Sequence, residues 1–320
     1  MRAPDPHPIA GLPGRVGVYE VGPRDGLQNE ASPVSLATKL EFIERLASSG
    51  LSTIEATSFV SPRWVPQLAD AGELYPLLPV RPGLRLPVLV PNQAGLDRAV
   101  AAGVSHIAVF GSATESFARR NLNRSVDESL RMFEPVVASA KSNGMWVRCY
   151  VSMCFGDPWE GPVEPGQVVG VCKRLMEMGC DELSVGDTIG VATPGQVHDL
   201  LDGLGSAGIA TGQLAVHFHD TYGQALANTL AALEAGVATV DASAGGLGGC
   251  PYADSATGNL ATEDLVWMLH GLGIDTGVDL ESLVATSSWM AQKLGRPSPS
   301  RVVQALAGGA PALEDALEEP

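Results

Sequence analysis

The chain has 320 residues, of which 45% are apolar and 18% charged, and its formal net charge is −16. This balance is typical of a folded globular protein and excludes an intrinsically disordered one. The excess of Asp and Glu argues against nucleic acid or an anionic membrane surface as a partner, because both attract Lys and Arg. The sequence shows neither a run of about 18 apolar residues nor the apolar core of a signal peptide, so we expect a cytoplasmic protein that does not span a membrane.

The cysteines support the same compartment. The chain has five, an odd number without the CxxC spacing, which argues against a disulfide framework or a zinc cage. Free thiols in a reducing cytoplasm are the simplest interpretation. The five are Cys149, Cys154, Cys172, Cys180 and Cys250.

Short β-branched runs alternate with Ala- and Leu-rich helical patterns along the chain. The predicted strands are residues 16–21, 52–59, 86–90, 106–110, 146–153, 182–185, 213–219 and 239–243. The predicted helices between and after them are residues 35–48, 126–140, 167–178, 224–235 and 259–272. Eight strand–helix units in succession predict an α/β protein with a (β/α)8 TIM barrel. The alternative, a doubly wound open sheet, more often shows a Gly-rich phosphate turn after its first strand, and this chain has none.

The pattern also indicates how the domain is bounded. No Pro- or Ser-rich linker separates the units, so we expect one catalytic domain over residues 15–309. Residues 279–294 and 300–306 are predicted as additional C-terminal helices outside the barrel. We expect residues 1–14 to form a flexible N-terminus and residues 310–320 an acidic, flexible tail.

Reactive side chains follow the predicted strands, at the rim where a barrel places its active site. The relevant segments are 22–28 after the first strand, Glu55 and Ser58 in the second, 186–188 after the sixth, 217–220 at the end of the seventh and 245–252 after the eighth. These positions lie far apart in the sequence. A barrel brings them together, so the sequence predicts one shared site.

A metal site is the first candidate function of this rim. His217 and His219 are two residues apart on a predicted strand, so their side chains point to one side, and Asp25 is a natural third ligand. The His-x-His pattern alone favours a chance pairing of the two histidines, but their rim position and the presence of Asp25 favour metal ligation. Asn259 could add a neutral oxygen, or it could be a helix N-cap with Glu263 one turn further on.

Three charged side chains have alternative interpretations. Arg24 is either the salt-bridge partner of Asp25 or a cation that stabilises a developing enolate or carboxylate. Glu55 and Asp187 are each a candidate base, an orienter of Arg24 or a buried structural acid, and their spacing leaves all three interpretations open.

A glycine-rich run precedes Cys250. Residues 245–249 contain four glycines, which predict a mobile loop able to fold over a rim site. Cys250 would then be a reactive loop thiol, and the alternative is a buried, inert one. The run lacks the Lys-Ser/Thr that follows the glycines of a nucleotide-binding P-loop, which argues against nucleotide hydrolysis.

Taken together, these segments resemble the hydroxymethylglutaryl-CoA lyase family of divalent-metal TIM-barrel lyases. The resemblance runs from Val16 to about Ala305. It is based on VGPRDGLQNE at 21–30, IEATSFVSPRWVPQLAD at 54–70, GDTIGVATPG at 186–195, HFHDTYGQALAN at 217–228 and SAGGLGGCPYA at 243–253. The last segment is the most specific, because it is similar to a lyase signature that the related condensing enzymes lack.

The resemblance implies roles for individual residues. It implies a Mg²⁺ or Mn²⁺ ion held by Asp25, His217, His219 and Asn259, catalytic roles for Arg24, Cys250, Asp187 and Glu55, and substrate contacts by Arg24, Gln28 and Ser58. The implied substrate is an acyl-CoA, and a homo-oligomer is compatible with the family. A place in leucine degradation and ketone-body metabolism also follows from the resemblance alone.

The implied reaction is a reversed Claisen cleavage of 3-hydroxy-3-methylglutaryl-CoA to acetyl-CoA and acetoacetate. His217 or Asp187, directly or through water, is the candidate base for the tertiary hydroxyl. The alternatives are a lyase for a related longer 3-hydroxyacyl-CoA, or an enzyme that condenses acetyl-CoA with a 2-oxo acid. The Cys-Pro-Tyr sequence at 250–252 and the short chain after the barrel argue against the condensing enzyme. A binding module without catalysis is disfavoured because every expected ligand is present.

Overall fold

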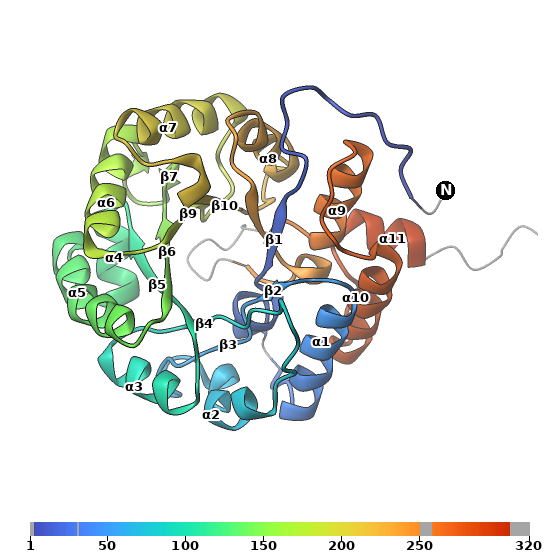
Figure 1. Cartoon of the computed structure of the whole chain (residues 1–320), viewed down its shortest axis with the longest axis horizontal. Helices are drawn as coiled ribbons and strands as arrows, with labels where there is room; N and C mark the ends of the chain where they lie inside the picture. Colours follow the sequence, from blue (N-terminus) through green and yellow to red (C-terminus); the bar gives the residue numbers. More distant parts are fainter. Residues whose placement is uncertain (1–2, 31, 250–257, 308–320) are drawn as a thin grey trace, which may run out of the picture.

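The structure, a computed structural model, describes residues 3–30, 32–249 and 258–307. Its main sheet is parallel and has the strand order β2-β1-β11-β10-β9-β6-β5-β4-β3. The two end strands, β2 and β3, are consecutive pieces of one segment, so the sheet closes into a ring with the helices outside it (Figure 1). This arrangement confirms the predicted (β/α)8 barrel.

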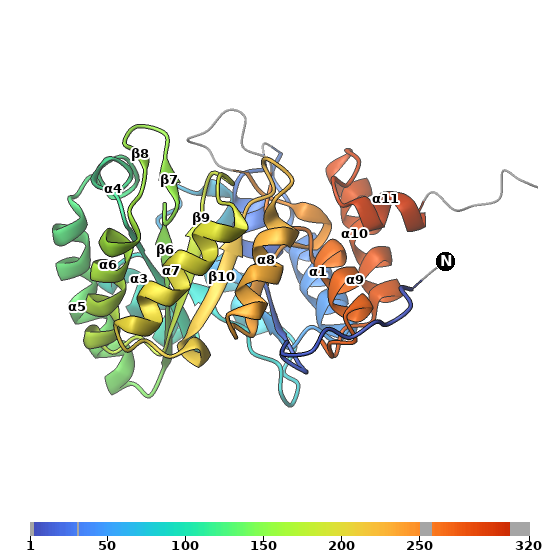
Figure 2. The same cartoon turned by 90° about the horizontal axis from the view of Figure 1, so that it is seen from above.

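The strands are short, as is usual for a tilted barrel. They are β1 (Gly17–Glu20), β2 (Thr53–Ile54), β3 (Thr57–Ser58), β4 (Val88–Leu89), β5 (His106–Ser112), β6 (Trp146–Ser152), β9 (Glu182–Asp187), β10 (Leu214–Phe218) and β11 (Thr239–Ala242). An antiparallel hairpin of β7 (Gly156–Asp157) and β8 (Gly161–Pro162) follows β6 and projects from one end of the barrel (Figure 2).

Two predicted strands differ from the structure. The predicted strand 52–59 is divided, because β2 pairs with β1 whereas β3 pairs with β4 on the opposite side. At the division, Glu55 N–H donates to Glu20 O and Ala56 N–H donates to Pro87 O. The predicted strand 86–90 shortens to β4, because Pro87 and Pro91 flank it and lack an amide hydrogen for the ladder.

The helices surround the ring, and several caps fix where they begin. They are α1 (Leu36–Ser48), α2 (Ala71–Leu74), α3 (Gln93–Ala101), α4 (Glu115–Leu122), α5 (Val126–Ser142), α6 (Pro165–Met178), α7 (Pro194–Ser206), α8 (Ala225–Glu234), α9 (Thr262–Gly271), α10 (Leu280–Leu294) and α11 (Arg301–Ala307). Ser35 and Asp279, predicted as the first residues of two helices, are the N-caps of α1 and α10, where their side chains accept backbone N–H bonds.

Helices α2, α3, α4 and α7 have no predicted counterpart. In α7 the three glycines at 195, 203 and 205 weaken the intrinsic helical preference. The helix forms because Val197, Leu200, Leu201 and Leu204 are buried against the rest of the protein, so tertiary packing outweighs local propensity.

The apolar core lies between the strands and the helices, and the inside of the ring is polar. Strand β6 shows the alternation: Val147, Cys149 and Val151 are buried in the apolar core, whereas Arg148 and Tyr150 face the barrel interior. Such a polar interior must be held by hydrogen bonds and ion pairs, because an unpaired buried charge is costly.

The C-terminal helices pack outside the barrel, as predicted, with α10 against α1 and α9 (Figure 1). In the described part of the N-terminus, His7 N–H donates to Gly271 O at 2.7 Å. The predicted tail at 310–320 lies outside the described residues. No helix within the described ranges is long and apolar enough to cross a membrane.

Two glycines that follow helices give a matched test of backbone packing. Gly50 has a φ of +93°, and a Cβ there would lie 2.1 Å from Gly277 O. Gly103 has a φ of +79°, but its Cβ would meet nothing within 4 Å. We expect Gly103→Ala to lower the free energy of unfolding by about 1 kcal/mol, the cost of a left-handed alanine. Gly50→Ala should lower the free energy of unfolding by at least ~2 kcal/mol more than Gly103→Ala does, because the backbone at Gly277 must move. Urea denaturation measures both, and equal losses would contradict this packing.

Candidate active site

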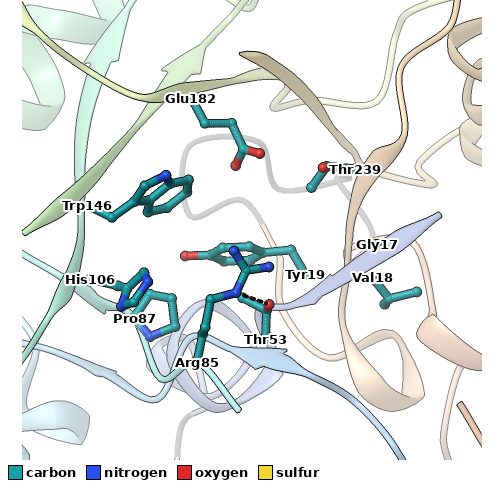
Figure 3. A pocket seen from close by; sticks show the side chains of 10 residues that line it. All are labelled: Gly17, Val18, Tyr19, Thr53, Arg85, Pro87, His106, Trp146, Glu182 and Thr239. Carbon is teal, nitrogen blue, oxygen red and sulfur yellow. Dashed lines mark hydrogen bonds between the residues drawn. The ribbon is translucent and has the colours of Figure 1, made fainter. Parts of the chain in front are cut away.

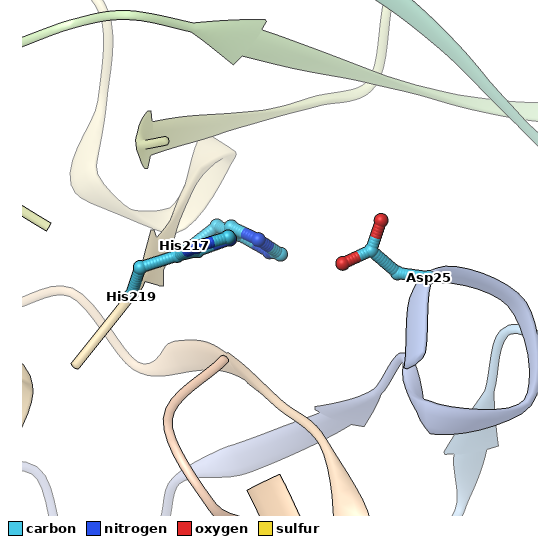
Figure 4. Close-up of side chains that lie close together, drawn as sticks. All are labelled: Asp25, His217 and His219. Carbon is cyan, nitrogen blue, oxygen red and sulfur yellow. The ribbon is translucent and has the colours of Figure 1, made fainter. Parts of the chain in front are cut away.

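Three predicted metal ligands converge at the carboxyl ends of β1 and β10, which lie on either side of β11. Asp25 lies in the helical turn η1 (Gly22–Gly26), which follows β1, while His217 lies on β10 and His219 just beyond it. One ligand atom from each lies within 4.8 Å of the others. Figure 4 shows both imidazoles extending toward the carboxylate. Two imidazoles and a carboxylate suit a divalent cation such as Mn²⁺ or Mg²⁺.

Asn259 completes this group. It forms an antiparallel bridge with His219, and its Nδ2 donates to Asp25 Oδ2 at 2.8 Å and to Leu247 O at 3.0 Å. Its Oδ1 is buried and accepts no hydrogen bond from the described residues, so it is available as an oxygen ligand. The N-cap interpretation is wrong, because α9 begins at Thr262, three residues later.

A buried carboxylate orients His217. The imidazole Nδ1 lies 3.1 Å from Asp241 Oδ2 on the neighbouring strand β11. An ionised carboxylate only accepts hydrogen bonds, so a hydrogen on Nδ1 would be donated to Asp241 and would leave the Nε2 lone pair for a metal. This is the usual arrangement of a metal-binding histidine.

Arg24 is held by two carboxylates and an aromatic ring. Its Nη1 donates to Asp25 Oδ1 and its Nε to Glu55 Oε2, both at 2.6 Å. The guanidinium carbon lies 5.2 Å from the centroid of the Tyr150 ring, and the Tyr150 hydroxyl donates to the same Glu55 oxygen at 3.0 Å. Arg24 is therefore a salt-bridge partner of Asp25, and Glu55 is the residue that orients it. Burial raises the pKa of Glu55, although Arg24 opposes this effect.

Asp187 holds a loop. Its two carboxylate oxygens accept the N–H groups of Val191 at 3.0 Å and Ala192 at 2.9 Å, in the segment after β9. Burial raises its pKa to about 6. Arg24 is oriented by Asp25 and Glu55 instead, so the interpretation of Asp187 as the orienter of Arg24 is wrong.

The two predicted substrate-contact residues besides Arg24 have protein partners in the structure. Gln28 Nε2 donates to Asp25 Oδ1 at 2.9 Å, which makes it a support of the carboxylate. Ser58 Oγ accepts the N–H of Val60 at 3.1 Å, and the residue is 1% exposed. Substrate contact by either side chain stays a prediction.

The glycine-rich segment begins in a turn that two buried carboxyls hold. Glu20 Oε1 accepts the N–H groups of Gly22 and Ala244, both at 2.8 Å. Glu263 Oε2 accepts the N–H of Gly245 at 2.9 Å. Burial raises the pKa of Glu20 to about 7 and that of Glu263 to about 8. Cys250, the predicted loop thiol, lies outside the described residues.

Sequence reasoning missed three residues that complete the site: Asp241, Arg148 and Tyr150. Each is a polar residue within an otherwise apolar strand, and each faces the barrel interior. A buried strand that contains a single charge is a signal of an internal polar network, and this signal was present in RCYVS and TVDAS.

Comparison with known proteins identifies the family of this barrel. A family model described as HMGL-like matches residues 15–290, most of the chain. The chain belongs to the HMGL-like family. Within that family, it is 51% identical over 305 residues to mitochondrial hydroxymethylglutaryl-CoA lyase of Rattus norvegicus, covering 95% of this chain and 94% of the relative. It is 52% identical over 297 residues to the rat enzyme named as cytoplasmic 3-hydroxy-3-methylglutaryl-CoA lyase, covering 93% and 86% of the two chains.

Solved structures agree. The chain is similar to hydroxymethylglutaryl-CoA lyase from Pseudomonas aeruginosa, with a TM-score of 0.91, 46% identity and coverage of 94% of this chain and 100% of the other. It is also similar to an HMG-CoA lyase from Acinetobacter baumannii in complex with coenzyme A and 3-methylmalate, with a TM-score of 0.87, 35% identity and coverage of 94% and 97%. The HMGL-like family thus accounts for nearly the whole chain.

The pKa of Glu263 predicts how stability depends on pH. Between the ordinary value of 4.5 and about 8, the folded protein keeps a proton that the unfolded chain has lost. The free energy of unfolding should therefore fall as the pH rises through this window, by up to about 1.4 kcal/mol per pH unit from this group. Glu263→Gln should remove this contribution to the fall of the free energy of unfolding, which urea denaturation at several pH values across the window measures.

Glu73→Gln is the matched control, because Glu73 is exposed to solvent. Its pH profile should follow that of the wild type. A Glu263→Gln profile that also follows the wild type would contradict the assignment of a proton to Glu263.

Proposed function

We propose that this protein is a divalent-metal-dependent lyase that cleaves 3-hydroxy-3-methylglutaryl-CoA to acetyl-CoA and acetoacetate. The observation that carries the proposal is the convergence of Asp25, His217, His219 and Asn259 Oδ1 beside Arg24, in a chain of the HMGL-like family. The names of the relatives and the coenzyme A in one similar structure support an acyl-CoA as the substrate.

The donor set fits the proposed cofactor. Two imidazole nitrogens, one carboxylate and one amide oxygen are ligands that Mn²⁺ and Mg²⁺ accept. Asp25 keeps both oxygens oriented through Arg24, Gln28 and Asn259, so its carboxylate is fixed before any ion arrives. A bound divalent ion supplies a Lewis acid that lowers the pKa of the substrate hydroxyl.

The side chains around it would move the proton and stabilise the charge. His217 already faces Asp241 through Nδ1 and belongs to the ligand cluster (Asp25, His217, His219 and Asn259), so Asp187 is the better of the two candidate bases. Its pKa of about 6 leaves it ionised at neutral pH, ready to accept the hydroxyl proton directly or through water. The carbon–carbon bond then breaks, acetoacetate forms, and the electron pair remains on the thioester as an enolate.

Arg24 and Cys250 would complete the reaction. The guanidinium of Arg24, fixed by Glu55 and Tyr150, offsets the charge of the enolate. Cys250, or a water that it orders, delivers a proton to the enolate carbon and releases acetyl-CoA. We also propose a cytoplasmic location, although relatives bear both cytoplasmic and mitochondrial names.

Product analysis tests the function directly. The purified protein is incubated with 3-hydroxy-3-methylglutaryl-CoA and Mg²⁺ or Mn²⁺, and the products are separated by mass spectrometry. Acetyl-CoA and acetoacetate in equal amounts are expected, with loss on chelation and recovery on metal addition. Condensation of acetyl-CoA with a 2-oxo acid, or cleavage of only a longer 3-hydroxyacyl-CoA, would overturn the assigned reaction.

Substitution of Arg24 separates charge stabilisation from metal binding. Arg24→Met should lower kcat by about 10²–10³-fold, the usual effect of removing one such stabiliser. Affinity for Mn²⁺ should stay within a few fold, because Asp25 keeps its bonds to Gln28 and Asn259. Arg24→Lys should rescue only part of the rate, since an ammonium cannot reach both carboxylates as a planar fork does. Near-normal kcat in Arg24→Met would leave Arg24 a purely structural role.

The thiols predict where alkylation occurs. Burial raises the pKa of Cys149, Cys154 and Cys172, so these three hold little reactive thiolate. We expect one equivalent of iodoacetamide to label Cys250 and inactivate the enzyme, with protection by substrate. Cys250→Ser should keep its melting temperature and lose turnover. A lower melting temperature with unchanged turnover per folded molecule would instead make Cys250 a packing residue.

A further inference from the structure

The barrel interior contains a charged network that the proposed chemistry does not use. Asp241 on β11 is 1% exposed and Arg148 on β6 is 0% exposed, and both are more buried than Asp25 and His217 at the rim. We propose that Asp241, clamped by Arg148, is a positioning residue that sets the tautomer and ring orientation of His217 for metal binding. The inference rests on the proposed function, because it concerns the metal site of that reaction.

The two oxygens of Asp241 have separate tasks. Oδ2 faces His217 Nδ1 at 3.1 Å and accepts the Ser184 hydroxyl at 2.8 Å. Oδ1 accepts Arg148 Nη2 at 2.5 Å. Since both oxygens are engaged on fixed strands, the carboxylate cannot turn away from the imidazole. His217 is held with its hydrogen on Nδ1 and its Nε2 lone pair at the ligand cluster.

Arg148 keeps this carboxylate ionised within the barrel. Its guanidinium carbon lies 3.8 Å from the centroid of the Tyr19 ring and 5.0 Å from that of Tyr150, so two aromatic faces enclose it. Its Nε forms an ion pair with Glu182 Oε1 at 2.9 Å, while its Nη2 bonds Asp241. An arginine does not lose its proton in proteins, so Asp241 always faces a full positive charge.

The same network reaches the second half of the site. Tyr150, which packs on Arg148, donates its hydroxyl to Glu55, and Glu55 orients Arg24. The Tyr150 ring also meets the His217 ring edge-on, with centroids 5.9 Å apart. The orientation of His217 is thus coupled by contacts to the orientation of Arg24.

A purely structural ion pair is the competing interpretation, and Glu182 provides the matched control. Both Asp241 and Glu182 are carboxylate partners of Arg148, so neutralising either disturbs the same buried charge. Glu182 lines a pocket of about 40 Å³ at the amino ends of the strands, with Tyr19, Trp146 and Thr239 (Figure 3). His217 is not among the residues of that pocket.

The substitution Asp241→Asn has a defined chemical consequence. The amide oxygen of Asn would turn to Arg148, which offers only donors, and the amide NH₂ would then face His217. The imidazole would accept this bond at Nδ1 and carry its hydrogen on Nε2, the tautomer that cannot bind a metal there. In Glu182→Gln this bond to His217 is unchanged.

The experiment titrates metal-stripped protein with Mn²⁺ and follows free Mn²⁺ by electron paramagnetic resonance. We expect the Kd for Mn²⁺ to rise about 10–100-fold in Asp241→Asn, the usual effect of losing such a partner. In Glu182→Gln the Kd should stay within about two-fold of the wild type, although both variants lose stability to urea. An unchanged Kd in Asp241→Asn, or an equal rise in both variants, would overturn the proposal.

A second measurement does not require a variant that folds with an altered core. Nitrogen-15 spectra of metal-free wild-type protein report the tautomer of each histidine. The signals of His217 are those that disappear in His217→Gln. The hydrogen of His217 is expected on Nδ1, and a hydrogen on Nε2 would overturn the proposal. Wild-type protein that binds no Mn²⁺ while its His217 has the expected tautomer would instead contradict the metal-dependent function.

Discussion

The register of three neighbouring parallel strands determines the site. Tyr19 on β1 and His217 on β10 are both paired with Asp241 on β11. Because parallel strands end at the same face, this register brings the turn after β1, with Asp25, next to the end of β10. A slip of one residue would turn His217 toward the helices and Asp241 out of the interior. The ligand cluster, the orientation of His217 and the place of Arg24 all depend on it.

The sequence predicted the barrel and the ligand cluster because both leave periodic or positional signals. Strand–helix alternation indicates the ring, and the rim of a ring is where His217 and Asp25 must meet. Asn259 was ambiguous, since an Asn followed four residues later by Glu263 has the composition of a helix start. Only tertiary structure shows that the chain stays extended there, bridged to His219.

The interior network could not be derived in the same way. Whether Arg148 or Asp241 faces the inside depends on strand register and tilt, and neither is readable from one strand alone. The alternatives left open for Glu55 and Asp187 also needed geometry, because both are acids at strand ends. Their hydrogen-bond partners distinguish them. Glu55 accepts a bond from the guanidinium of Arg24, while Asp187 accepts bonds from backbone N–H groups. The reactive residues at the rim can therefore be predicted from sequence more readily than the interior residues that hold them in place.

Closure of the ring also decides when, during folding, this site comes into existence. Strand β1 pairs with β11, so Asp25 and Asp241 come from opposite ends of the sequence. A chain emerging from the ribosome can form its first strand–helix units, but it cannot assemble the ligand cluster until the last units have been made. An ion that binds only the closed ring would draw the equilibrium toward closure and away from open intermediates. Metal supply would then affect the yield of folded protein as well as its turnover.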